Sequence, residues 1–417
     1  MVLRLPKRLR LQEKKVTTSV SSGWLPPNSR GCDSNAMAMV QAPVMFRQFC
    51  ASSYGLPRFS SFSPALGERL VVRCSSGSDS DSKQKVVFLG TPSVAAGVLD
   101  ALLDSSRADD SLFEVAAIVT QPPAARGRGR KQLPSPVAAR ALEREFPASL
   151  IWSPEKASEE GFLKDLVALR PDLCVTAAYG NYLPSKFLAI PTCGTVNVHP
   201  SLLPLYRGAA PVQRALYDGV DVTGVTVAYT VRAMDAGPII ASERVNVDPN
   251  IKAPELLSYL FGRGTELLLR ELPAILDGSA KLNATPQDDS LATHAAKVTV
   301  EESWLSFQET AVTCHNKVRA FAEWPGAKCK FQTRSSDGQI KTLELKIITT
   351  RVGGSVENSD GLVKLIGDAL VVPCGDNTTL EILELQPPGK KVMRAKDFCN
   401  GLRGQQILVS NTVHVSV

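Results

Sequence analysis

Residues 86–119 read VVFLGTPSVAAGVLDALLDSSRADDSLFEVAAIV, an apolar run, a helical pattern and a second apolar run in succession. The first run, 86–89, has the length and composition of a buried strand and ends at a Gly-Thr-Pro turn. Ser93 is a suitable N-cap for the helix that follows, whose apolar residues recur at helical spacing. The second run, 115–119, is again a short strand. This order of elements predicts a parallel sheet that helices cover on both sides.

The same alternation continues to about residue 277. We expect helices from about 136 and at 161–170, strands at 173–178, 194–198 and 224–231, and a long helix at 254–277 that Pro273 interrupts. The fold class is therefore α/β, with a Rossmann-like, mostly parallel sheet, and such sheets bind ligands at the carboxyl ends of their strands. The chain has neither Gly-x-Gly-x-x-Gly nor Gly-Lys-Ser/Thr, which argues against a dinucleotide or P-loop site.

Residues 197–211 read NVHPSLLPLYRGAAP and follow the strand at 194–198. Alternation along a strand puts Asn197 and His199 on the same face, and the prolines that follow stop the strand and stiffen the loop. An amide and an imidazole beside an apolar Leu-Leu-Pro wall suit a flat, partly apolar ligand. A lone histidine after a strand more often has a structural hydrogen-bonding role. Here the other three histidines, His294, His315 and His414, sit in ordinary settings, which favours a functional role for His199.

Two further segments carry candidate chemistry. Asp235 precedes a glycine between two strands, where a carboxylate is either a turn residue or a functional group. The loop at 121–133, QPPAARGRGRKQL, is strongly basic and has no acid; its cations are Arg126, Arg128, Arg130 and Lys131. Arginine makes forked contacts to phosphate and glycine permits close approach, so the loop suits a nucleic-acid backbone. A solvated basic loop is the ordinary alternative.

Length and composition limit the number of domains and the classes of partner that the chain can have. The chain of 417 residues is long enough for two domains and an extension, and 44% of it is hydrophobic. No apolar run approaches the roughly 20 residues of a membrane helix, so we expect no membrane partner. The net charge of +6 is a mild indication of an anionic partner. The nine cysteines form no Cys-x-x-Cys pair and have no histidine at zinc spacing, which predicts buried thiols in a reducing compartment, without a metal or disulfide framework.

Residues 1–82 differ in composition from the rest of the chain. Up to residue 75 they contain only the acids Glu13, Asp33 and Glu68 against many Arg and Lys, and they are rich in Ser. A basic, Ser-rich, acid-poor segment without a compact apolar core is typical of an organelle transit peptide, followed by a flexible leader. A disordered basic tail is the alternative. Mitochondrion and plastid are hard to separate on these grounds, and residues 71–74 would suit a plastid processing site.

The C-terminal part has a different pattern. Residues 279–302 are polar and without clear periodicity, so we expect a linker there, between a first domain at 83–278 and a second at 303–417. A helix at 309–322 is followed by strand-like runs at 343–349, 362–365, 369–372 and 380–385. Short strands with turn residues predict a small OB-like barrel, a fold that often binds nucleic acid. Lys390 and Lys391 are candidate nucleic-acid contacts, although a short charge run is usually just solvated.

Three of these motifs together resemble one family. NVHPSLLP at 197–204 is similar to the active-site strand of the folate-dependent formyltransferases, Asn-x-His-x-Ser-Leu-Leu-Pro. FLGTP at 88–92 and the segment 385–398, LQPPGKKVMRAKDF, resemble the methionyl-tRNA formyltransferases in particular. The resemblance runs colinearly over about residues 84 to 417.

The resemblance implies an activity and a site. It implies transfer of the formyl group of 10-formyltetrahydrofolate to initiator methionyl-tRNA, without a metal, by an organellar enzyme that we expect to be a monomer in the mitochondrion or, alternatively, the plastid. It assigns the catalytic roles to Asn197, His199 and Asp235. It assigns tetrahydrofolate binding to Ser201, Leu202, Leu203 and Pro204, and tRNA binding to the basic loop and the second domain. The family often has Thr or Ser where this chain has Ala236, and the version in this chain, Asp-Ala-Gly-Pro-Ile-Ile at 235–240, is more similar to that of the family's purine-pathway relatives.

Two alternatives remain open at this point. A formyltransferase acting on a small amine such as glycinamide ribonucleotide would share the first domain, but it has no need of the second domain or the basic loop. A barrel-type RNA-binding protein with an inactive first domain would share the second. The presence of Asn197, His199 and Asp235 together argues against the latter.

Overall fold

The computed structural model describes residues 82–126, 131–355 and 362–409. Within these residues, seven strands form one sheet in the order β10-β9-β7-β6-β1-β2-β5. They are β1 (Gln84–Gly90), β2 (Phe113–Val119), β5 (Ile151–Trp152), β6 (Leu173–Ala177), β7 (Thr195–His199), β9 (Val222–Tyr229) and β10 (Ile239–Asn246). Strands β5, β2, β1, β6 and β7 are parallel, whereas β9 pairs antiparallel with both β7 and the edge strand β10. The prediction of a mostly parallel sheet is confirmed.

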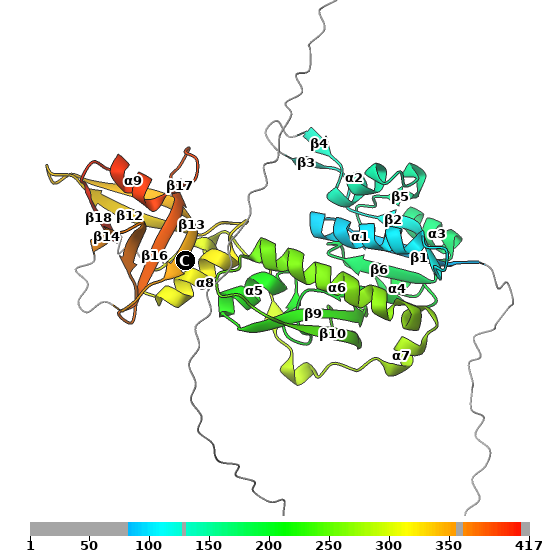
Figure 1. Cartoon of the computed structure of the whole chain (residues 1–417). Helices are drawn as coiled ribbons and strands as arrows, with labels where there is room; N and C mark the ends of the chain where they lie inside the picture. The colour runs from blue at the N-terminus through cyan, green and yellow to red at the C-terminus, as the bar shows by residue number, and fades with distance from the viewer. Residues whose placement is uncertain (1–81, 127–130, 356–361, 410–417) are drawn as a thin grey trace, which may run out of the picture. The chain divides into compact units, whose positions relative to one another are not determined.

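Both faces of the sheet are covered, and the side chains alternate between them as strand geometry requires. In β1, Val86 and Phe88 belong to one apolar cluster, and Val87 and Leu89 to another; all four are fully buried. Helices α1 (Ser93–Ser106), α2 (Pro136–Glu143) and α6 (Ala253–Leu276) contribute to the first cluster, and α3 (Glu160–Leu169) and α4 (Ser185–Leu188) to the second. Figure 1 shows α1 and α6 lying along the sheet.

Two details of the helices differ from the sequence-based expectation. Helix α1 begins at Ser93 itself, and Pro92 occupies the N-cap position without a side-chain cap. Helix α6 continues through Pro273, so the expected interruption there is wrong. Proline removes one backbone donor, but this one lies in the last turn and its carbonyl still accepts from Asp277 N at 3.0 Å. The buried side chains of Leu272 and Ile275 on the same turn favour continuation of the helix.

The segment expected to be a linker is hydrogen-bonded along the first domain. After α7 (Ser279–Asn283), residues 285–296 run along the first domain and contact β10 and then β8. These residues are here called the strap. Thr285 exchanges two 2.8 Å backbone hydrogen bonds with Ile239. Further on, β11 (His294–Ala295) pairs in parallel with β8 (Arg207–Gly208). The strap is therefore attached to the loop that follows β7.

The second domain is a small barrel, as the sequence predicts. Its strands are β12 (Lys328–Arg334), β13 (Ile340–Val352), β14 (Leu362–Ile366), β15 (Ala369–Pro373), β16 (Thr379–Gln386) and β18 (Gln406–Val409). In the described part of the chain they follow the order β13-β12-β18-β14-β15-β16, and pairing of β13 with β16 closes the ring. Strand β17 (Met393–Arg394) adds to β16, and α9 (Ala395–Gly401) packs through Ala395 and Phe398 on the apolar interior.

Helix α8 (Ala311–Ala320) leads into the barrel and packs on α5 (Pro211–Asp218) through an apolar cluster. The ring of Phe321 stacks on that of Tyr217 with centroids 5.8 Å apart. His315, buried in α8, contacts Pro249 O through Nε2 at 3.0 Å and Thr350 Oγ1 through Nδ1 at 2.9 Å. Because a carbonyl only accepts, Nε2 carries the proton and Nδ1 accepts from the threonine hydroxyl.

Candidate active site

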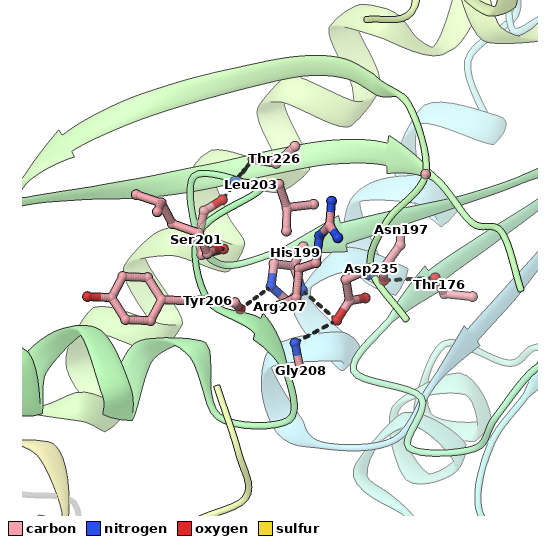
Figure 2. Close-up of polar contacts among 12 residues, drawn as sticks. Thr176, Asn197, His199, Ser201, Leu203, Tyr206, Arg207, Gly208, Thr226 and Asp235 are labelled. Carbon is pink, nitrogen blue, oxygen red and sulfur yellow. Dashed lines mark hydrogen bonds and ion pairs between the residues drawn. The ribbon is translucent and has the colours of Figure 1, made fainter. Parts of the chain in front are cut away.

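Strand β7 presents Asn197 and His199 on one face, because Val196 and Val198, which alternate with them, face the apolar cluster that includes α6. On the neighbouring strand β6, Thr176 lies in register with Asn197. The buried Thr176 hydroxyl donates to Asn197 Oδ1 at 2.8 Å, as Figure 2 shows, and its oxygen also lies 3.1 Å from a second acceptor, the carbonyl of Val196. Because the amide is planar and its oxygen is engaged by Thr176, its NH2 group is directed away from that contact as a donor.

His199 ends β7 with only 4% of its surface exposed. Its Nε2 lies 3.0 Å from the carbonyl of Tyr206, so Nε2 is the protonated nitrogen of the neutral ring. Its Nδ1 lies 3.8 Å from Asp235 Oδ2. The ring is thus fixed on one side and faces a carboxylate on the other, an arrangement in which Nδ1 can accept a proton and the carboxylate can stabilise the resulting charge.

Asp235 reaches this position from the loop between β9 and β10. Its backbone has φ +50°, in the left-handed region that costs a non-glycine residue free energy. Its Oδ2 accepts from Gly208 N at 2.9 Å, and its side chain is 18% exposed. Figure 2 shows the carboxylate between His199 and Gly208, with Asn197 beside it. The structure therefore brings together the three residues assigned to catalysis.

Glycine is required at two positions next to Asp235. At Gly208, φ is +124° and an added Cβ would lie 2.7 Å from the carbonyl oxygen of Ala295 in the strap. At Gly237, an added Cβ would lie 1.7 Å from the carbonyl oxygen of Tyr229. Since real Cβ atoms do not approach backbone oxygen so closely, these glycines let the two loops lie against their neighbours.

The loop after His199 is held by its own polar groups. The buried Ser201 hydroxyl donates to Leu205 O at 2.6 Å, and Thr226 Oγ1 donates to Ser201 O at 2.7 Å. Thr226 Oγ1 also accepts from Leu203 N at 3.1 Å. Leu203 is buried, whereas Leu202 and Pro204 are half-buried. Ser201 thus serves the shape of the loop, while the expected role of residues 201–204 in folate binding stays a prediction.

The ends of the neighbouring strands are joined to one another. Thr91, just after β1, donates its hydroxyl to Tyr179 O, just after β6, at 2.8 Å. Gln121, just after β2, donates from its backbone to Thr91 Oγ1 at 3.4 Å. These contacts order the carboxyl edge of the parallel strands, the edge where α/β sheets bind ligands.

Comparison with known proteins identifies the family. A model described as formyl transferase matches residues 84–270, and one described as formyl transferase, C-terminal domain, matches residues 297–403. The methionyl-tRNA formyltransferase of Staphylococcus epidermidis is 33% identical over 319 residues, 76% of this chain and 96% of that protein. The chain belongs to the methionyl-tRNA formyltransferase family. It is a formyl-transferring enzyme, as the sequence predicted.

Another member of the family, from Lactobacillus acidophilus, is 37% identical over 316 residues, 76% of this chain and 95% of that protein. Among solved structures, the sugar 3N-formyltransferase WlaRD has a TM-score of 0.52 at 15% identity, covering 74% of this chain and all of that one. The N-formyltransferase of Helicobacter canadensis, in complex with folinic acid and dTDP-3-aminofucose, has a TM-score of 0.51 at 15% identity, with 73% and 100% covered. At these identities the two structures establish a shared fold.

The residues expected to bind tRNA lie partly outside the described ranges. Arg128 and Arg130 fall in the undescribed segment 127–130. On its flanks, β3 (Ala124–Arg126) and β4 (Lys131–Leu133) form an antiparallel pair in which Arg126 is opposite Lys131. The side chain of Lys131 is exposed, as are those of Lys390 and Lys391. Most of the proposed transit segment, residues 1–81, also lies outside the described ranges.

Several residues that shape the site lack a signal that sequence reasoning could use. Thr176 is the exception, since it ends an expected strand next to the one that carries Asn197. The backbone N–H of Gly208 and the side chain of Gln287 contribute through contacts with residues far away in the sequence, and Tyr206 contributes its carbonyl, a group that every residue has. Searched over the described residues, the chain has no cluster of three or more His, Cys, Asp or Glu side chains suited to a metal ion. Within the same residues, no helix has the length and apolar character needed to span a membrane.

Proposed function

We propose that the chain transfers the formyl group of 10-formyltetrahydrofolate to the amino group of methionine on initiator tRNA, as an organellar enzyme. The observation that carries the proposal is the convergence of Asn197, His199 and Asp235 in a chain that spans nearly the whole length of its methionyl-tRNA formyltransferase relatives.

The transfer requires a donor for the oxygen of the formyl group. As the methionyl nitrogen forms its bond to the formyl carbon, the carbonyl oxygen takes up negative charge. Asn197 supplies an NH2 group whose direction the Thr176 contact sets before the substrate arrives. A donor fixed in advance stabilises that charge by about 3 kcal/mol in comparable acyl transfers, equivalent to more than a hundredfold in rate.

The transfer also requires movement of one proton. The attacking amine loses a proton, and the bond between the formyl carbon and N10 breaks as N10 gains one. In the proposal, Nδ1 of His199 accepts the proton, directly or through water, and returns it to N10. Asp235, 3.8 Å from Nδ1, stabilises the imidazolium that exists between these two steps. The products are formylmethionyl-tRNA and tetrahydrofolate, and the proton count balances.

The second domain and the basic loop support tRNA as the acceptor. A small closed barrel next to the catalytic domain suits a nucleic acid, and Lys390 and Lys391 lie exposed at its surface. Arg126, Arg128, Arg130 and Lys131 would add contacts to the phosphate backbone. An acceptor as small as glycinamide ribonucleotide would use neither feature.

The organellar assignment is based on the basic, acid-poor composition of residues 1–82. We propose the mitochondrion as the compartment, with the plastid as the alternative, and a monomer as the active form. Tagging the full chain at its C-terminus and sequencing the N-terminus of the imported protein tests the leader. Removal of most of residues 1–82 is expected, and an imported protein that still begins at Met1 would contradict the assignment.

A labelled formyl donor tests the reaction itself. With 10-formyltetrahydrofolate carrying a labelled formyl group, we compare methionyl-initiator tRNA, methionyl-elongator tRNA and glycinamide ribonucleotide as acceptors. The proposal predicts the highest kcat/KM with the methionyl-initiator tRNA. Preferential labelling of the small ribonucleotide would show instead that this chain acts on a free amine.

A further inference from the structure

Gln287, in the strap, makes four hydrogen bonds at the edge of the active site. Its Nε2 donates to the carbonyls of Asp235 at 2.8 Å and Gly237 at 2.7 Å. Its Oε1 accepts from Nε and Nη2 of Arg207 at 2.9 and 2.7 Å. We propose that Gln287 is a positioning residue, which holds Asp235 in the conformation that places its carboxylate beside His199. This inference rests on the proposed function, because it assigns Gln287 to the same reaction.

Asp235 depends on its neighbours for this conformation. A φ of +50° is sparsely populated by aspartate and costs about 1 to 3 kcal/mol, so it persists only where surrounding contacts enforce it. The carboxylate is held by Gly208 N, and the backbone on either side of Ala236 is held by the two bonds from Gln287. Without Gln287, the loop would keep the Gly208 contact on the carboxylate, the bond from Ala236 N to Ala233 O at 3.4 Å and the bond from Tyr229 N to Pro238 O at 2.9 Å, none of which engages the carbonyl of Asp235 or Gly237.

Glutamine matches this place in a way that similar residues do not. A primary amide has two N–H donors and two acceptor lone pairs, and here all four are used. Glutamate has the same shape but would set carboxylate oxygen against the carbonyls of Asp235 and Gly237. Alanine would remove all four bonds.

Arg207 links Gln287 to the segment that binds the Asp235 carboxylate, so that the contacts form a closed ring. Its guanidinium binds Gln287, and the backbone N–H of the next residue, Gly208, binds the Asp235 carboxylate, as Figure 2 shows for the latter contact. Gln287 therefore fixes both the segment that carries the carboxylate and the segment that holds it. The strap adds a similar contact at His199, because Thr293 Oγ1 accepts from Tyr206 N at 2.8 Å and the Tyr206 carbonyl holds the ring.

Asp289 provides a matched control. It lies two residues away in the strap and also binds Arg207 Nη2, at 2.8 Å, but its side chain is 82% exposed. Exposed ion pairs contribute little, and among the described residues the Asp289 side chain has its ion pair with Arg207 and no hydrogen bond to the Asp235 loop. Asp289→Ala should leave kcat within about twofold of the wild type.

The test measures kcat, KM and the melting temperature for Gln287→Ala and Gln287→Glu, with initiator methionyl-tRNA as acceptor. We expect kcat to fall about 10- to 100-fold in both variants, since displacement of a catalytic group by about 1 Å has effects of that order. The KM values for donor and tRNA should stay within about threefold. Gln287→Glu keeps the acceptor for Arg207, so normal kcat in that variant would overturn the role assigned to the two donor bonds. If Gln287→Ala does not fold, Gln287→Glu alone still tests the proposal.

A double-mutant cycle separates positioning from general structural support. If Gln287 acts through Asp235, then adding Gln287→Ala to Asp235→Asn should change the single-turnover rate less than about twofold. The same 10- to 100-fold loss in both backgrounds would overturn the inference. A wild-type chain that transfers no formyl group would contradict the proposed function, whereas an active wild type with unchanged Gln287 variants would contradict only this role.

Discussion

The orientation of Asn197 can be tested by removing its partner without touching it. Thr176→Val replaces the hydroxyl that donates to Asn197 Oδ1 at 2.8 Å with a methyl group of similar size. A buried hydrogen bond of this kind contributes about 0.5 to 1.5 kcal/mol. If that free energy keeps the amide in its working orientation, kcat should fall about 2- to 12-fold, at 1.36 kcal/mol for each tenfold change. Asn197→Ala, which removes the donor itself, should lower kcat by about 100- to 1000-fold.

The assay is single-turnover formyl transfer at saturating donor and methionyl-tRNA, with KM measured separately. Both KM values should stay within about twofold, because Thr176 touches the amide and not a substrate. Thr265→Val is the matched control, since this buried threonine in α6 also loses a hydroxyl bond, 2.7 Å to Phe261 O, without contacting Asn197. A normal kcat in Thr176→Val would refute the reasoning that the bond sets the catalytic orientation of Asn197.

Three further predictions concern other parts of the chain. Gly208→Ala should lower both the melting temperature and kcat, because its Cβ would lie 2.7 Å from Ala295 O. Gly262→Ala, where the added Cβ meets open space, should lower neither. Equal melting temperatures for the two variants would contradict the requirement for glycine at position 208. Burial lowers the pKa of His315 below its unfolded value of about 6.5, so the unfolded state binds more protons and the free energy of unfolding should fall as the pH drops below about 6.5. In urea titrations, the free energy of unfolding of His315→Asn should depend less on pH than that of the wild type. An unchanged pH dependence would contradict the lowered pKa of His315. Arg128→Ala combined with Arg130→Ala should raise the KM for tRNA and weaken its salt dependence, and an unchanged KM would remove the assignment of the basic loop.

Periodic patterns predicted most of the sheet and the helices on it. In β1 the apolar residues are continuous, in β7 they alternate with polar ones, and the helices carry their own spacing signals. Strand β12 was not predicted, although it carries such a signal, since Cys329, Phe331 and Thr333 alternate as buried residues. The two-residue strands β8 and β11 have none, because they exist only through pairing between residues more than 80 positions apart.

The same distinction applies to the site. Asn197 and His199 share a strand, so alternation alone placed them together. The proximity of Asp235 to His199 depends on a left-handed turn and on Gly208, and family resemblance was needed to include it. Gln287 belongs to a polar stretch without periodicity, where only the folded chain shows that its amide contacts the loops on both sides of the carboxylate.

Single-turnover transfer by His199→Ala and Asp235→Ala tests the central claim most directly. Each variant is mixed with labelled 10-formyltetrahydrofolate and methionyl-initiator tRNA, and formylmethionyl-tRNA is followed over time, with circular dichroism as the check on folding. Because these residues are assigned to proton transfer and its support, the rate should fall at least about 100-fold in both folded variants. A folded His199→Ala or Asp235→Ala enzyme that transfers the formyl group at close to the wild-type rate would contradict the account.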